Sequence, residues 1–70
     1  MDDQELVRKV EAMREKGFYL HLTTGMTKYS VTFREYNGHH FEAIHPVVYD
    51  ENLGTAVMQA ALKAMEGEHG

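Results

Sequence analysis

The chain has 70 residues, enough for a single small domain that spans residues 1–70. It contains no cysteine, which excludes disulfides and thiolate zinc sites, and its 43% hydrophobic residues exclude a disordered chain. Seven Lys and Arg against eleven Asp and Glu give a net charge of −4, which argues against binding to nucleic acid or to anionic membranes.

The sequence has no long apolar run, and its first residues are acidic where a signal peptide carries positive charge. We therefore expect no membrane partner and a cytoplasmic location. The outermost residues, 1–2 and 67–70, are expected to fray.

The first predicted element is a helix from about Asp3 to Lys16. Asp2 can act as its N-cap, and Glu5 stands three residues later, where a capping box places an acid. Gly17 follows the helix, at the position where a left-handed residue commonly ends one. Apolar residues recur at helical spacing, at Leu6, Val10 and Met13.

Two alternating runs, residues 18–23 and 29–36, predict a β-hairpin. A two-residue turn of type II′ at Gly25-Met26 suits the glycine in its first position. That turn sets a register with three apolar pairs on one face: Leu22 with Tyr29, Leu20 with Val31 and Phe18 with Phe33.

A second turn is predicted at residues 37–39, Asn-Gly-His. A two-residue type I′ turn would pair Phe33 with Glu42 and place an acid in the core. A three-residue loop instead pairs Phe33 with Ala43 and sets Arg34 opposite Glu42, a favourable cross-strand pair. We therefore expect the three-residue loop.

The three-residue loop also pairs Glu35 with Phe41. It predicts a third strand from about His40 to His45, with His45 pointing towards the helices. This strand stops at Pro46, which cannot donate to the ladder. The following segment, Val47-Val48-Tyr49, either extends the strand or forms a connector packed on the core.

The last predicted element is a helix from about Leu53 or Thr55 to Met65, ended by Gly67. Its alanines favour helix and allow close approach to a sheet. Its expected apolar face contains Val57, Met58, Ala61, Leu62 and Met65.

The predicted order is α-β-β-β-α, which indicates an α+β fold. Its sheet is expected to be a three-stranded antiparallel meander, with both helices packed on one face and the other face open to water. This order resembles that of the double-stranded-RNA-binding domain over nearly the whole chain.

In that family, the loop between the first two strands carries a Gly-Pro-x-His motif, and the second helix begins with a lysine cluster. Here the two segments read Thr24-Gly25-Met26-Thr27 and Asp50-Glu51-Asn52-Leu53-Gly54-Thr55. Both RNA-binding motifs are missing, and the second segment is acidic. The resemblance therefore implies the topology without the activity.

The stretch from Leu53 to Leu62 is similar to the last helix of small phage and prophage proteins. Proteins of this size and origin are often inhibitors that bind host machinery, anti-CRISPR proteins among them. This second resemblance implies a phage-encoded inhibitor of a host or defence complex.

Five histidines raise the question of a metal site. In the predicted register His21 faces Ser30 and His40 faces Tyr36, levels that lie roughly 20 Å apart along the sheet. The sequence also lacks a nucleophile elbow and an oxyanion loop that would turn Ser30 and His21 into a catalytic pair. We therefore expect no enzyme, no catalytic residue, no metal and no cofactor.

The open sheet face carries the main functional hypothesis, because tyrosine and arginine are enriched at binding hot spots. It is interpreted either as an ordinary solvated face or as the surface of a protein-interaction module that acts by steric occlusion. Nucleic-acid binding is the alternative function. The expected contact residues, which include one at the tip of the first hairpin, are Tyr19, His21, Met26, Thr32, Arg34, Tyr36, His40 and Glu42.

Both predicted edge strands, residues 18–23 and 40–45, are uncovered. Uncovered edges invite pairing with a partner or a second copy, and a dimer would stabilise so small a core. A homodimer is therefore possible.

Overall fold

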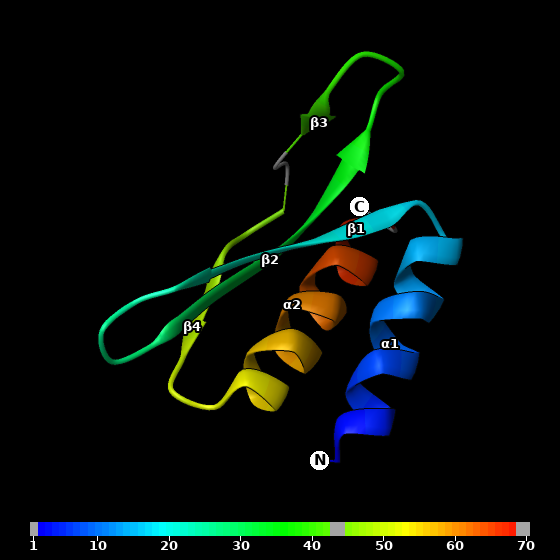
Figure 1. Cartoon of the computed structure of the whole chain (residues 1–70). Helices are drawn as coiled ribbons and strands as arrows, with labels where there is room; N and C mark the ends of the chain where they lie inside the picture. The colour runs from blue at the N-terminus through cyan, green and yellow to red at the C-terminus, as the bar shows by residue number, and fades with distance from the viewer. Residues whose placement is uncertain (1, 43–44, 69–70) are drawn as a thin grey trace.

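The computed structural model describes residues 2–42 and 45–68. Two helices lie side by side on one face of an antiparallel sheet, which confirms the α+β fold (Figure 1). The elements in chain order are α1 (Asp3–Glu15), β1 (Phe18–Thr24), β2 (Tyr29–Tyr36), β3 (Phe41–Glu42), β4 (Val48–Asp50) and α2 (Leu53–Glu68).

Helix α1 begins at the predicted Asp3 and ends one residue before the predicted Lys16. The Asp2 carboxylate accepts a hydrogen bond from the Glu5 N–H at 2.8 Å, so Asp2 is an ordered N-cap rather than a frayed end. The helix ends at Glu15, Lys16 is its C-cap, and Gly17 follows with a φ of 94° that glycine adopts at low cost. Met13 is the buried residue of this helix and joins it to the sheet.

The β1–β2 hairpin has the predicted faces but not the predicted register. Leu22 lies opposite Val31 and Leu20 opposite Phe33, a shift of two residues. The turn is centred on Met26-Thr27 and closed by the Gly25 N–H, which donates to the Lys28 carbonyl at 2.9 Å. Gly25 does not have a positive φ, so the predicted type II′ turn is wrong. Because the shift is even, every side chain keeps its face.

The β2–β3 pairing differs from the prediction by one residue. Glu35 lies opposite Glu42 and Tyr36 opposite Phe41, so the three-residue loop and the Arg34–Glu42 pair are wrong. The turn is centred on Gly38-His39, with Gly38 at a φ of 99°.

A slip of one residue moves each side chain to the other face of the sheet. Phe41 therefore lies beside Tyr36 on the open face, and not in the core beside Glu35. The predicted Phe33–Ala43 pair lies outside the described residues.

The predicted third strand is shorter, and the segment after Pro46 extends the sheet. Strand β4 pairs with β2, with Val48 opposite Val31, along the edge that β1 leaves free. Glu35 pairs with Glu42, and Val31 pairs with Val48. Between these two pairs, β2 contributes three residues, 32–34, and the chain between β3 and β4 contributes five, 43–47. The connection is therefore two residues longer than the segment of β2 between the same pairs.

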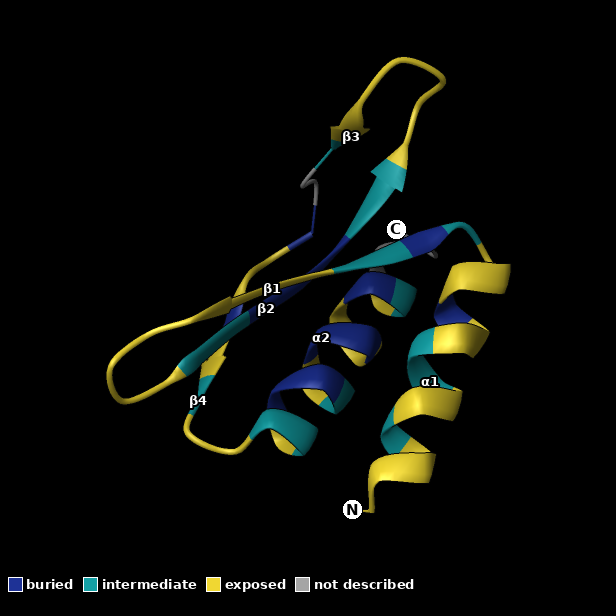
Figure 2. Cartoon of the chain, viewed as in Figure 1, coloured by how far each residue is buried: buried dark blue, intermediate teal, exposed yellow. Residues whose placement is uncertain are grey.

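Helix α2 packs its small residues against the sheet. Ala56, Ala60 and Ala64 recur every four residues and are fully buried, so the helix backbone lies close to β2 and β4 (Figure 2). Leu62, predicted on the apolar face, is 57% exposed. Gly67 does not end the helix, which continues to Glu68, because glycine lowers helix propensity without breaking the backbone hydrogen bonds.

The core lies between the sheet and the two helices. Neither α1 nor α2, among the described residues, is long and apolar enough to cross a membrane. The buried hydrophobic residues are Met13, Phe18, Val31, Phe33, Val48, Ala56, Val57, Ala60, Ala61 and Ala64.

Candidate functional site

We call the sheet surface that faces away from the helices the open face. No helix or strand of residues 2–42 and 45–68 covers it (Figure 1). It holds two features, an aromatic cluster and a polar hollow, with Arg34 between them. The side chains concerned come from β1, β2, β3 and β4 and are Tyr19, His21, Thr23, Ser30, Thr32, Arg34, Tyr36, Phe41, Val47 and Tyr49.

The aromatic cluster consists of Tyr19, Tyr36 and Phe41. The Phe41 ring packs edge-on against Tyr19, with centroids 5.3 Å apart, and lies 5.0 Å from Tyr36. Tyr36 and Phe41 are nevertheless 52% and 51% exposed. Rings of this size usually bury much of their surface in cores or at interfaces, so the cluster is a ready contact area for a partner.

The polar hollow lies beside the cluster, with a volume of about 270 Å³. Two cross-strand pairs contribute to it, His21 with Thr32 and Thr23 with Ser30. The predicted pairing of His21 with Ser30 is therefore wrong, as a consequence of the shifted register. Val47 and Tyr49 add apolar surface, Arg34 adds a guanidinium, and no lining residue carries a carboxylate.

Arg34 is the unusual residue of the hollow. Its side chain is only partly exposed, and its buried Nε has no hydrogen-bond partner among the described residues. It lies directly opposite Tyr19 on β1 and away from the acid expected beside it. A buried donor without a partner costs free energy, and an acceptor supplied by a ligand would remove that cost.

Thr32 was predicted to contact a partner, but it is too buried to do so. Its side chain belongs to the open face of β2 and is only 2% exposed. Its hydroxyl lies 3.2 Å from the His45 carbonyl and 3.3 Å from the Pro46 carbonyl and donates to them. Thr32 thus anchors the connection between β3 and β4 and is not available to a partner.

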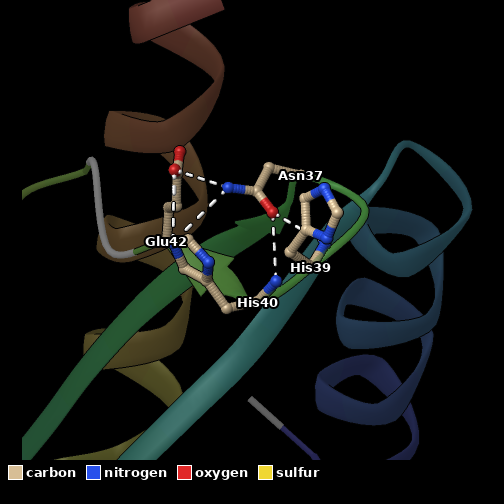
Figure 3. Close-up of polar contacts among 4 residues, drawn as sticks. All are labelled: Asn37, His39, His40 and Glu42. Atoms are coloured by element: carbon tan, nitrogen blue, oxygen red, sulfur yellow. Dashed lines mark hydrogen bonds and ion pairs between the residues drawn. The ribbon is translucent and has the colours of Figure 1, made fainter.

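His40 and Glu42 are held by the β2–β3 turn (Figure 3). The Asn37 side-chain oxygen accepts from the backbone N–H groups of His39 and His40, at 2.9 and 3.0 Å. Its amide nitrogen donates to Glu42 at 2.7 Å, and the His40 ring lies 3.4 Å from the same carboxylate. The Asn37 side chain thus closes the turn and sets the β2–β3 register. The sequence pattern of the turn alone did not predict this register.

The remaining predicted contact residues are accessible but dispersed. His21 is exposed and lines the hollow, while Met26 is fully exposed at the tip of the β1–β2 hairpin, away from the cluster. The prediction missed Phe41 because of the one-residue register slip. It missed Val47 and Tyr49 because their segment had two open interpretations.

His45 has a structural role on the helix side, where the sequence predicts it. It is 9% exposed, its ring lies 5.4 Å from that of Phe18, and its Nε2 is 3.0 Å from the Glu35 carboxylate. Across residues 2–42 and 45–68, no three side chains of His, Asp or Glu come together as a metal site requires.

A second depression lies on the helix side, between α1, β1 and α2. Its walls are mostly aliphatic, with Glu11 and Arg14 as the charged exceptions. Its walls resemble those of a small-molecule site, which are mostly apolar with a few polar groups. The open face is the stronger candidate for binding a protein, because exposed aromatic rings lie there beside a guanidinium, an imidazole and hydroxyls.

Comparisons with protein-family models, curated proteins and solved structures gave no significant match. The two resemblances noted in the sequence therefore stay predictions, and the functional argument depends on the open face itself.

Proposed function

We propose that this protein is a non-enzymatic protein-interaction module that binds its partner through the open face and occludes a surface of that partner. The observation that carries the proposal is the aromatic cluster of Tyr19, Tyr36 and Phe41 on an uncovered sheet, in which the rings of Tyr36 and Phe41 are half exposed. Tyrosine and arginine dominate binding hot spots, and Arg34 lies beside the cluster.

The proposed class of partner is based on the sequence resemblances. We propose that the protein is a phage-encoded, anti-CRISPR-like inhibitor that occludes a host or defence complex. Because such a complex lies in the cytoplasm, we propose the same location for this protein. The free edge of β1 supports a homodimer as a further proposal, because its outer backbone groups have no strand beside them among the described residues.

The test is a pull-down from host lysate, treated with nuclease, using wild type and a Tyr36→Ala/Phe41→Ala double variant. Leu62→Ala is the matched control, because Leu62 is similarly exposed but lies on α2. We expect a discrete protein complex with wild type and the control, and at least about a tenfold lower yield with the double variant.

Equal capture by the double variant would contradict the assignment to the open face. A yield that disappears with nuclease would favour the nucleic-acid alternative, against which the net charge of −4 argues.

A further inference from the structure

We propose that the polar hollow on the open face binds a carboxylate, presented by an acidic side chain of the partner. This inference rests on the proposed function and names the chemistry of the group that the face recognises. It concerns Arg34, Ser30, Thr23 and His21, and not the aromatic cluster.

The donors of the hollow come from two neighbouring strands. Ser30 lies opposite Thr23, His21 is the next residue of β1 on the same face, and Arg34 follows Thr32 on β2. Arg34 carries a planar guanidinium that can hold a carboxylate through two parallel hydrogen bonds. Its Nε is buried and lacks a partner among the described residues, so a carboxylate that accepts from it, once the guanidinium turns into the hollow, offsets the cost of the unpaired donor.

The Thr32 hydroxyl does not compete for the ligand. It donates to the carbonyls of His45 and Pro46 at the base of the hollow, which fixes the segment that carries Val47. The hollow is thus built on a paired sheet and an anchored connection, so the backbone that carries its donors is fixed before a ligand arrives.

Charge favours a carboxylate over a phosphate. Arg34 is the only lining residue with a full positive charge, and a carboxylate carries one negative charge to match it. A phosphate carries up to two, which would leave an uncompensated charge on a protein whose net charge is already −4. Val47 and Tyr49 offer apolar surface for the methylene groups of an acidic side chain.

The test is an NMR titration of the 15N-labelled full chain with N-acetylglutamate amide, which carries one side-chain carboxylate. N-acetylglutamine amide is its neutral counterpart, and inorganic phosphate is the competing anion. The variants are Arg34→Gln and Ser30→Ala. Arg8→Gln is the matched control, because it removes the same charge from the exposed surface of α1.

We expect saturable shifts at His21, Thr23, Ser30 and the Arg34 Nε–H with the glutamate compound and none with the glutamine compound. Arg34→Gln should weaken binding at least about tenfold, while Arg8→Gln leaves it unchanged. Ser30→Ala should weaken binding less, with the resonances of the buried Phe33 and Val57 unmoved, which shows that the fold is intact.

The proposal is overturned if no saturable shift occurs, if the neutral compound gives the same shifts, or if Arg8→Gln weakens binding as much as Arg34→Gln. Tighter binding of phosphate at the same residues would overturn the assignment to a carboxylate. Because the titration uses no partner, its failure is separate from that of the pull-down, which depends on Tyr36 and Phe41.

Discussion

Thr32 shows how a single hydroxyl can decide the shape of the open face. Among the described residues it is the most buried polar side chain, and its hydroxyl donates to the His45 and Pro46 carbonyls and so satisfies backbone acceptors beside β2. From the sequence, Thr32 was expected on the open face as a contact residue for a partner. Its anchoring role depends on the His45 and Pro46 carbonyls, whose position beside β2 the sequence does not predict.

Replacing Thr32 by Val keeps the shape of the side chain and removes its donor. We expect the free energy of unfolding to fall by about 1–2 kcal/mol, since the buried His45 carbonyl and the partly buried Pro46 carbonyl lose this donor. Urea denaturation followed by circular dichroism measures this. Thr23→Val, on the same face but exposed, is the control and should stay within about 0.5 kcal/mol of wild type. Equal stability of the Thr32 variant would show that the hydroxyl does not hold the connection.

Gly38 tests the backbone of the β2–β3 turn. A Cβ at this position would meet no atom within 4 Å, so the cost of Gly38→Ala arises from its φ of 99° alone. We expect a loss of about 1 kcal/mol, and a smaller loss for Gly38→Asn, because asparagine tolerates positive φ better than alanine. The same urea titration measures both variants, and an alanine variant as stable as wild type would contradict this description of the turn.

At the scale of the elements, the sequence predicts α1, the two hairpins and the faces of β1 and β2 well. These features depend on residues close in the sequence, and such local signals can be recognised from the sequence alone. They are the Asp2 cap, the glycine at position 17 and the strict alternation along the strands. Both registers were wrong. The first turn has the predicted length but lies one residue later, and the length of the second depends on side-chain hydrogen bonds of Asn37. An error of two residues was harmless, whereas an error of one moved Phe41 from the core to the open face.

Helix α2 shows a similar limit. Hydrophobicity alone selects Leu62 for the buried face, but a stripe of alanines faces the sheet and Leu62 is left exposed. Close approach of a helix to a sheet favours the smallest side chains. The pattern of hydrophobic residues does not reveal this preference, because it ranks leucine above alanine.

The alanine stripe predicts a sharp response to larger side chains. Ala60→Leu should destabilise the fold by about 1–3 kcal/mol or more, since Ala60 is 1% exposed and the added atoms must displace the sheet or the helix. Ala12→Leu is the control, because Ala12 is exposed on α1 and helix propensity changes equally. Thermal unfolding compares the two, and equal melting temperatures would show that α2 does not pack as closely as described.

At the scale of the whole molecule, one side of the sheet provides the core and the other provides the functional surface. The helices cover one face completely enough to bury Val31 and Phe33, while the open face keeps two half-exposed aromatic rings beside a polar hollow. The alternation along the strands predicted that the sheet has one buried and one open face. It did not predict which residues form the functional surface. The positions of Phe41, Val47 and Tyr49 on that surface are set by strand pairing between distant parts of the chain.

The most direct measurement of the central claim is photo-cross-linking in host lysate, with benzoylphenylalanine placed at Phe41 or, for comparison, at Leu62. The two side chains are similarly exposed, but only Phe41 lies on the open face. The account predicts one discrete protein adduct from position 41, insensitive to nuclease, and none from position 62. Adducts from position 62 alone, or equal adducts from both positions, would contradict the open face as the interaction surface.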